Sequence, residues 1–220
     1  MKGRWIGTGV TVIIVSLFAN HHARADQSDS DAKWTFENSP TNTIPTGWIV
    51  GETNGKKTPA TWEVIKRSDK KGQCVAITTN KNSGDTFNLL LAKNTTIKDV
   101  EISVLLKAIA GKEDQGGGLV WRLTDTNNYY ICRWNPLEDN IRLYVVKEGK
   151  RTQLASATIK AKTSIWHEIE VDQEGAKIKI EFDDKEVISF TDTTFTKAGM
   201  VGLWVKADGR TQFDSFEIDD

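Results

Sequence analysis

The segment Gly199-Met-Val-Gly-Leu-Trp-Val-Lys-Ala-Asp208, followed closely by Phe213-Asp-Ser-Phe216, decides the fold of this chain. Its large side chains recur at every second position, which is the period of a β-strand that has two different faces. The pair Asp208-Gly209 between the two stretches is a turn signal. The end of the chain therefore predicts two strands joined by a tight turn, as in an antiparallel β-sandwich.

The same pattern extends over the rest of the chain. Short runs rich in β-branched and aromatic residues are separated by turn residues such as those of Asn82-Ser-Gly84 and Gln173-Glu-Gly175. The predicted strands are 34–37, 48–50, 61–65, 74–79, 86–91, 100–109, 117–123, 129–134, 141–146, 152–159, 166–172, 177–182, 186–191, 200–205 and 212–218. This number of strands predicts an all-β fold, a two-sheet antiparallel β-sandwich of the jelly-roll type.

The first 25 residues have the features of a secretory signal peptide. Lys2 and Arg4 give a positive start, an apolar run follows from Ile6 to Ala19, and Ala23-Arg24-Ala25 fits an A-x-A cleavage site. The alternative, an uncleaved membrane anchor, is disfavoured because the apolar run is short and interrupted by small polar residues. We therefore expect a secreted or periplasmic protein, with no membrane span after cleavage near Ala25.

Cleavage divides the chain into a signal peptide at 1–25, a flexible leader at 26–33 and one jelly-roll domain at 34–220. The whole chain has 29 basic and 30 acidic side chains. The signal peptide contains three of the basic residues and no acidic one, which leaves 26 basic and 30 acidic side chains. Because nucleic-acid binding needs a basic surface, this balance argues against nucleic acid as a partner. We expect a monomer.

Alternation along the strands assigns side chains to faces. Tyr129, Ile131 and Arg133 point one way along their strand, and Arg142 and Tyr144 share a face of the next one. One arrangement of the strands places five residues on the same exposed, concave face of a sheet: Arg122, Arg133, Arg142, Trp204 and Lys206.

The stretch Asn127-Asn-Tyr-Tyr-Ile-Cys-Arg-Trp-Asn-Pro-Leu-Glu-Asp-Asn-Ile-Arg-Leu-Tyr144, with Trp166-His-Glu-Ile-Glu-Val171 and the ending described above, resembles the concanavalin A-like lectin/glucanase superfamily. More narrowly, the chain looks like secreted bacterial 3-keto-disaccharide hydrolase domains and laminin-G-like jelly rolls. The resemblance extends from Trp34 to Ile218. It implies a jelly roll with a concave sheet that faces a glycan, and some members of the group cleave 3-keto-glycosides.

The expected partner is therefore an oligosaccharide or glycan. Arginine donates paired hydrogen bonds to sugar hydroxyls or to a carboxylate, and aromatic rings stack on the apolar face of a sugar. The predicted binding residues are Arg122, Tyr129, Arg133, Asn135, Glu138, Arg142, Trp204 and Lys206. The alternative is that the arginines only pair with acidic residues across strands, and the sequence leaves both open.

Catalysis would need two carboxylates at a fixed separation. Glu168-Ile-Glu-Val-Asp172 is similar to the catalytic strand of laminarinase-type enzymes, but a solvated outer strand is the favoured interpretation. Glu138, on the loop after Pro136, is the weak candidate for a catalytic residue. The hydrolase domain carries an Asn-Ser-Gly-Ile-type segment ending in Arg, and here Gly116-Gly-Gly-Leu-Val-Trp-Arg122 matches only at the arginine. Whether the protein is an enzyme stays open.

Three functions follow as expectations: a secreted carbohydrate-binding domain, a glycoside hydrolase acting on 3-keto-disaccharides or related glycosides, and an envelope adhesion domain. An adhesion domain predicts an exposed apolar patch. The sequence establishes no cofactor, but the superfamily resemblance implies a possible Ca²⁺ site with Asp214 as the weak candidate ligand. Cys74 and Cys132 are either a disulfide of an exported protein or two buried thiols, and the second is favoured.

Overall fold

The computed structural model describes residues 32–56, 58–69 and 72–219. These residues form strands, turns and connecting segments, and none of them belongs to a helix of the length and apolar character that crossing a membrane requires. The predicted signal peptide and nearly all of the predicted leader lie outside the described residues.

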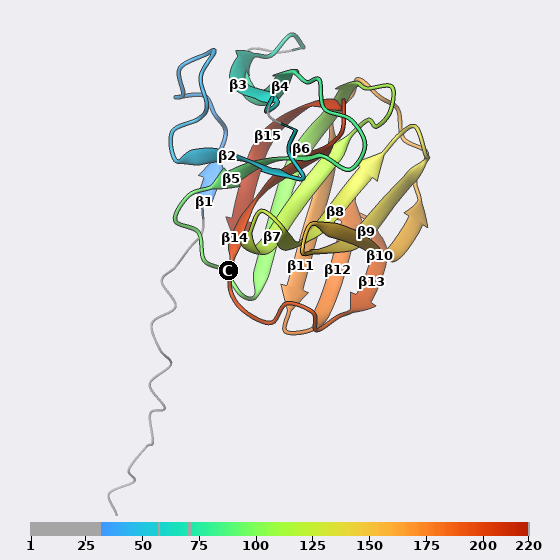
Figure 1. Ribbon diagram of the computed structural model, residues 1–220. Helices are drawn as coiled ribbons and strands as arrows, with labels where there is room; N and C mark the ends of the chain where they lie inside the picture. Colours follow the sequence, from blue (N-terminus) through green and yellow to red (C-terminus); the bar gives the residue numbers. More distant parts are fainter. Residues whose placement is uncertain (1–31, 57, 70–71, 220) are drawn as a thin grey trace, which may run out of the picture.

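Two antiparallel sheets pack face to face (Figure 1). Sheet A has the strand order β13-β12-β11-β6-β15-β4-β3, and β1 pairs with β15. Its strands are β1 (Ala32–Trp34), β3 (Thr61–Lys66), β4 (Gln73–Thr79), β6 (Val100–Ala110), β11 (His167–Glu174), β12 (Lys177–Phe182), β13 (Glu186–Thr191) and β15 (Arg210–Asp219). Every pairing in this sheet is antiparallel.

Sheet B has the strand order β10-β9-β8-β7-β14-β5-β2 and is also antiparallel throughout. Its strands are β2 (Trp48–Thr53), β5 (Phe87–Ala92), β7 (Gly117–Asp125), β8 (Asn128–Asn135), β9 (Asn140–Lys147), β10 (Lys150–Thr158) and β14 (Met200–Lys206). The predicted all-β, two-sheet jelly roll is confirmed. Each strand overlaps a predicted segment, and β1 differs most because Phe36 has a φ of 60° and cannot continue a strand.

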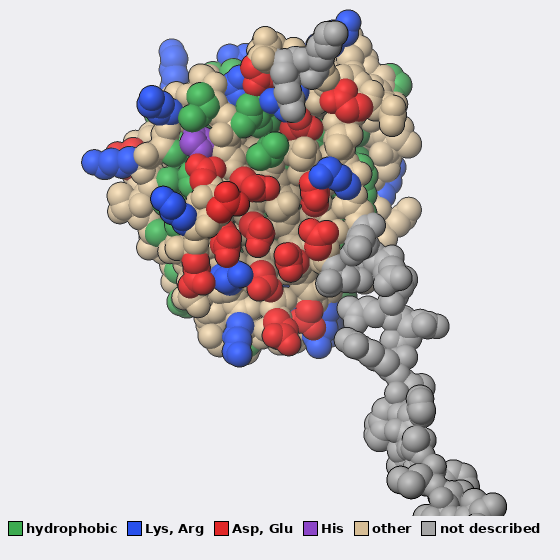
Figure 2. Space-filling model, turned by 180° about the vertical axis from the view of Figure 1, so that it is seen from behind, with side chains coloured by type: hydrophobic (Ala, Val, Ile, Leu, Met, Phe, Trp, Pro, Cys, Tyr) green, Lys and Arg blue, Asp and Glu red, His purple; other side chains and the backbone are tan. Residues whose placement is uncertain are grey.

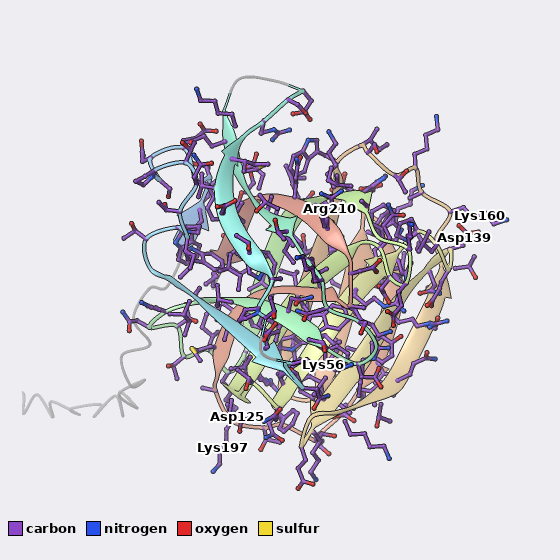
Figure 3. All side chains as sticks on the ribbon, turned by 45° about the horizontal axis from the view of Figure 1, so that its top comes forward. Lys56, Asp125, Asp139, Lys160, Lys197 and Arg210 are labelled. Atoms are coloured by element: carbon purple, nitrogen blue, oxygen red, sulfur yellow. The ribbon has the colours of Figure 1, made fainter. Side chains whose placement is uncertain are left out.

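The main core lies between the two sheets and is built from the inward-facing half of each alternating strand. Trp62 of sheet A and Trp121 and Trp134 of sheet B are buried there. The indole nitrogen of Trp121 donates a hydrogen bond of 2.6 Å to the side-chain oxygen of Gln173. Side chains fill the space between the sheets (Figure 3).

Cys74 and Cys132 are two buried, unbonded thiols. Cys132 lies in this core, whereas Cys74 alternates with the core residues Val75 and Ile77 of β4 and faces the other side of sheet A. The two cysteines belong to opposite sheets, on β4 and β8. Burial raises the pKa of the Cys74 thiol to about 12, because the thiolate would lose its hydration. Burial likewise raises the pKa of Cys132 far above its usual range. Both thiols therefore remain protonated and behave as small apolar side chains.

A second apolar core occupies the outer face of sheet B. Ten buried residues form it: Phe87, Leu89, Leu91, Val120, Leu123, Tyr129, Ile131, Tyr144, Val146 and Trp204. They come from five neighbouring strands and point away from the main core. An outer face of a flat sheet would leave such side chains in water, so their burial means that sheet B curls around them.

Contacts between the two edges of sheet B close this curl. Asn54, directly after the edge strand β2, donates a hydrogen bond of 2.9 Å to the carbonyl of Gly149, directly before the opposite edge strand β10. The β9–β10 hairpin turns through Glu148 and Gly149, which have φ values of 53° and 74°. Two positive φ values in a two-residue loop are those of a type I′ turn, which suits the twist of the strands. The hydroxyls of Thr53 and Tyr129 lie 2.6 Å apart inside the curl.

The outer face of sheet A is different, because it is open to solvent and acidic. Glu168, Glu170 and Asp172 of β11 are half-buried and alternate with the buried Ile169 and Val171. Asp and Glu side chains gather at the centre of the molecule when it is seen from behind (Figure 2). The segment from Glu168 to Asp172 therefore has its carboxylates on the solvent side of sheet A, as the favoured interpretation of the sequence predicted.

Candidate functional site

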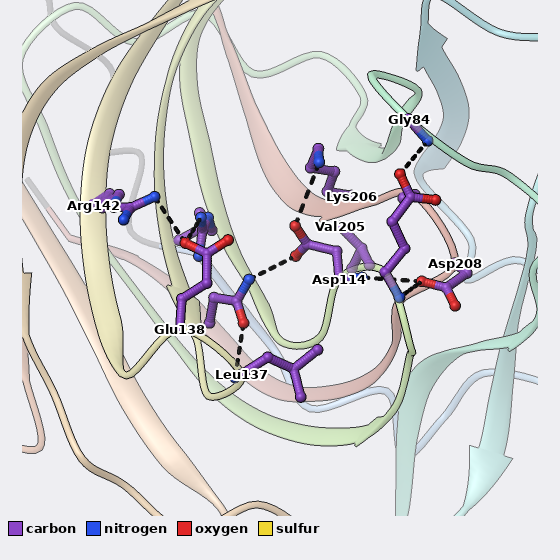
Figure 4. Close-up of polar contacts among 12 residues, drawn as sticks. Gly84, Asp114, Leu137, Glu138, Arg142, Val205, Lys206 and Asp208 are labelled. Atoms are coloured by element: carbon purple, nitrogen blue, oxygen red, sulfur yellow. Dashed lines mark hydrogen bonds and ion pairs between the residues drawn. The ribbon is translucent and has the colours of Figure 1, made fainter.

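Polar side chains gather at one end of the curled sheet B, beside the β8–β9 turn. We call them the arginine site, which comprises Asp114, Arg133, Asn135, Glu138, Asn140, Arg142, Tyr144, Arg151 and Lys206. Figure 4 labels Asp114, Glu138, Arg142 and Lys206 of this site. The β8–β9 turn lies next to the segment after β10, because the backbone nitrogen of Ile159 donates a hydrogen bond of 2.8 Å to the carbonyl of Asp139. Asp139 and Lys160 accordingly lie side by side in Figure 3.

Arg133 and Arg142 share one carboxylate. Nη2 of Arg133 lies 3.1 Å and Nη1 of Arg142 lies 2.8 Å from the same oxygen, Oε2 of Glu138. Arg133 also donates from Nη1 to the side-chain oxygen of Asn140 at 3.2 Å. Its Nε is buried and has no acceptor among the described residues. Arg133 is 1% exposed, whereas the side chains of Arg142 and Glu138 are 29% and 41% exposed.

The ring of Tyr144 is the centre of the site. Its hydroxyl accepts hydrogen bonds from Arg133 at 3.2 Å and from Arg142 at 3.3 Å. The guanidinium carbon of Arg151 lies 4.4 Å from the ring centroid, a cation–π distance. Three guanidinium groups therefore converge on one tyrosine, which is itself buried.

Asp114 forms the other side of the site. Its Oδ1 accepts a hydrogen bond of 3.2 Å from the amide of Asn135, and its Oδ2 lies 3.7 Å from Nζ of Lys206 (Figure 4). Oδ1 of Asp208 accepts hydrogen bonds from the backbone nitrogens of Glu113 and Asp114 at 3.0 and 3.1 Å. These bonds hold the loop that carries Asp114 against the end of β14.

The two carboxylates of the site are shifted in opposite directions. Burial raises the pKa of Asp114, because the charged form loses hydration. Burial also acts on Glu138, but hydrogen bonds from Asn140 and the charge of Arg133 outweigh it and hold the pKa of Glu138 below its usual range. Glu138 is therefore the ionised carboxylate at neutral pH, and Asp114 is the one that takes up a proton more readily.

The structure brings together five of the eight predicted binding residues: Arg133, Asn135, Glu138, Arg142 and Lys206. Two predicted stacking aromatics, Tyr129 and Trp204, are each 0% exposed in the second apolar core. Neither presents a ring face to a sugar, which corrects the expectation of an exposed aromatic face. The curl of sheet B buries them, and alternation along a strand does not report curvature.

Arg122 is separated from the arginine site, which corrects the predicted common face. Its φ is 46°, and the pairing of β7 shifts register between Trp121 and Asp125. This irregularity has the character of a β-bulge, which turns the side chain away from the face that alternation predicts. Arg122 is 1% exposed and donates hydrogen bonds to the backbone carbonyls of three segments, at Lys98, Phe195 and Gly175. These bonds hold loops together.

Asp214, the candidate calcium ligand, forms an ion pair with Arg67 and is buried. Its other oxygen accepts a hydrogen bond of 2.8 Å from the backbone nitrogen of Ser215. Within the described ranges, no group of three or more His, Cys, Asp or Glu side chains is arranged to hold a metal ion. The carboxylate of Asp214 is thus the partner of the Arg67 guanidinium in this structure.

Sequence reasoning missed Asp114, Tyr144 and Arg151. For Tyr144 the signal was present, because alternation places it on the same face as Arg142. For Arg151 the signal was the turn at Glu148-Gly149. A two-residue turn fixes the pairing of β9 with β10, and this pairing places Arg151 opposite Val146. Asp114 lies on a loop outside any strand, and only the tertiary fold brings it to Asn135.

Comparisons with known proteins agree with the fold. No protein-family model matches the sequence, and no curated protein matches it either. Among solved structures, the carbohydrate binding module CBM66 from Bacillus subtilis is similar, with a TM-score of 0.62 and 20% identity over 80% of this chain and 96% of that chain. The β-glucanase of Bacillus licheniformis has a TM-score of 0.61 and 14% identity over 88% and 100% of the two chains.

A Bacteroides ovatus GH16 protein in complex with a mixed-linkage glucan product has a TM-score of 0.60 and 12% identity, over 85% of this chain and 99% of that chain. At these identities the likeness shows the fold alone. The expected two-sheet jelly roll is thereby confirmed as a fold.

Proposed function

We propose that this protein is a secreted carbohydrate-binding domain and that the arginine site binds the glycan. One observation carries the proposal. The donor Arg142 and the acceptor Glu138, whose side chains are 29% and 41% exposed, are held in place by a layer of buried side chains beneath them. Arg133 and Tyr144 supply that layer through hydrogen bonds. A sugar ring offers adjacent hydroxyls that both donate and accept, which matches a guanidinium beside a carboxylate.

The similar structures support this proposal. One is described as a carbohydrate binding module, and another is the fourth domain of an arabinanase bound to arabinotriose, with a TM-score of 0.57 and 14% identity. The sequence predicted that exposed aromatic rings would stack on the sugar. In the proposed site, recognition depends instead on polar contacts around Arg142. Sites of this kind bind weakly unless the polar groups are preorganised, which the shared Glu138 carboxylate provides.

A glycan array followed by calorimetry tests the proposal. Arg142→Gln removes one exposed donor and should weaken binding of any glycan hit at least about tenfold, the loss expected for one charge-assisted hydrogen bond. Lys185→Gln removes a positive charge from the exposed β12–β13 turn on sheet A and serves as the matched control. Equal loss in both variants, or no loss in Arg142→Gln, would contradict binding at the arginine site.

A second candidate function, glycoside cleavage, is favoured by the pair Asp114 and Glu138. Two carboxylates in one site whose pKa values are shifted apart have the properties of a general acid and an ionised partner. Incubation with disaccharides and their 3-keto derivatives, with chromatography of the released monosaccharides, tests it. Release that disappears in Asp114→Asn and in Glu138→Gln would make the protein an enzyme, and absence of release would leave the binding function alone.

The same proposal includes export. Residues 1–25 act as a signal peptide, 26–33 as a leader whose last two residues pair with β15 as part of β1, and the domain at 34–220 works as a monomer in the periplasm or outside the cell. N-terminal sequencing of the exported protein should begin at Asp26. An intact Met1 in a membrane fraction would contradict this part of the proposal, and sedimentation measures the oligomeric state.

A further inference from the structure

Arg151 is the least satisfied cation of the arginine site. The ion pairs of the site join Arg133 and Arg142 to Glu138, and Lys206 to Asp114, and none among the described residues involves Arg151. Its Nη1 is buried with no hydrogen-bond acceptor in the described part of the chain. The side chain as a whole is only half-buried, so solvent reaches part of it.

Aromatic rings hold Arg151 in this position. Its guanidinium carbon lies 4.4 Å from the ring centroid of Tyr144, 5.3 Å from that of Phe87 and 5.8 Å from that of Trp204. A guanidinium over the face of an aromatic ring is attracted by the negative charge of that face. These contacts account for the position of the guanidinium, but they leave its buried Nη1 without an acceptor among the described residues.

The carboxylates of the site are already engaged. Glu138 serves two arginines through a single oxygen, and Asp114 interacts with Asn135 and Lys206. Asp85 acts on Arg151 only through space. Four cationic side chains therefore face two carboxylates, a formal excess of two positive charges, and burial of an unpaired charge is unfavourable.

We propose that the arginine site selects an acidic sugar, and that Arg151 is the main partner of its anionic group, a carboxylate or a sulfate ester. This inference rests on the proposed function and names the class of glycan. An oxyanion supplies the acceptors that Arg151 lacks, and a guanidinium binds it with two parallel N–H bonds. Arg142 and Glu138, which pair with each other and are 29% and 41% exposed, present their solvent-facing atoms to the hydroxyls of the same sugar.

Calorimetry with paired probes tests the inference. Trigalacturonate and its methyl ester differ only in the carboxylate charge, and a sulfated carrageenan tetrasaccharide and its desulfated form provide the same comparison for the sulfate ester. Sodium acetate and sodium sulfate alone show whether a free anion is sufficient. At least one acidic probe should bind at least tenfold more tightly than its neutral form, and the pair that shows the preference identifies the anionic group.

Arg151→Gln should remove this preference, while Lys150→Gln, a change at the exposed neighbouring residue on β10, should leave it unchanged. Equal binding of charged and neutral probes, a preference that survives in Arg151→Gln, or full binding of the free anions alone would overturn the inference and leave the proposed function standing. Binding of no oligosaccharide by the wild-type protein would overturn both.

Salt dependence of the wild-type protein provides a second test, in case Arg151→Gln does not fold. The affinity for the acidic probe should fall by roughly threefold or more between 50 and 300 mM NaCl, because salt screens the charge contact. The affinity for the neutral probe should hardly change. Salt-independent binding of the acidic probe would overturn the inference.

Discussion

The outer faces of the two sheets have the same alternating sequence pattern, but their side chains differ in burial. On sheet A, Glu168 and Glu170 of β11 stand in solvent beside other carboxylates. On sheet B, Trp204 and Tyr129 occupy equivalent outward positions and are completely buried. Sheet B curls until Asn54, after β2, reaches Gly149, before β10. Curvature therefore decides whether an outward-facing side chain becomes surface or core.

The comparison also explains where charge is found. Carboxylates on the open face of sheet A are only half-buried, and Asp172 and Glu181 lie near the ammonium group of Lys179. Cations at the end of the curled sheet B are partly or fully removed from water, so Arg133 needs Asn140, Glu138 and Tyr144 around it. A site that organises charge at low exposure is suited to recognition, because its groups are held in place before a ligand arrives.

The largest expected effect comes from truncating the second core. Trp204→Ala should lower the free energy of unfolding by about 3–5 kcal/mol, because it leaves a cavity inside the curl. Lys179→Ala on the outer face of sheet A, where the side chain is 39% exposed, should change it far less, because exposed ion pairs contribute little to stability. Urea denaturation of both variants measures the difference, and similar values for the two would mean that the curl is open in solution.

Arg122→Met tests whether Arg122 is structural or part of the binding surface. The change removes the buried side-chain donor of the carbonyls of Lys98, Phe195 and Gly175, and should destabilise the protein by about 3 kcal/mol. Glycan affinity of the folded variant, measured at low temperature, should equal that of the wild type. A variant with unchanged stability and weakened glycan binding would show that Arg122 belongs to the binding surface.

Glu170→Gln should stabilise the protein. Glu170 lies directly opposite Glu181 in the pairing of β11 and β12, and like charges at opposed positions are unfavourable. Removing one charge should raise the free energy of unfolding by roughly 0.2–1 kcal/mol at pH 7. Asp172→Asn is the control with a favourable partner, since Asp172 lies opposite Lys179. Destabilisation by Glu170→Gln would contradict the repulsion between Glu170 and Glu181.

The carboxylates of Glu168 and Glu170 should make stability depend on pH. Burial and neighbouring carboxylates raise the pKa values of Glu168 and Glu170 above about 4.3, the usual value in an unfolded chain. Protonation of the two groups therefore favours the folded state, and this contribution is lost as the pH rises through the folded pKa values. The double variant Glu168→Gln, Glu170→Gln should gain stability over the wild type at pH 7, and the gain should vanish near pH 4. A gain that grows toward low pH would contradict the raised pKa values.

The strands and the faces of most residues followed from local pattern. Arg133, Arg142 and Lys206 were placed on one face because a strand has a period of two, and the structure has them at one site. Alternation failed at Arg122, where a positive φ interrupts the strand. It also gave no sign that Trp204 would be buried, because burial on the outer face depends on segments distant in the sequence.

By itself, the sequence determined the all-β class, the fifteen strand segments and the turns between them, since these depend on residues within a few positions of one another. Only the tertiary structure decided that sheet B curls, that Asp114 meets Asn135, and that Arg151 rests on Tyr144. These contacts join residues whose separation along the chain carries no periodic signal. Their free energy comes from removing apolar side chains from water and from hydrogen bonds formed only once the sheets are packed.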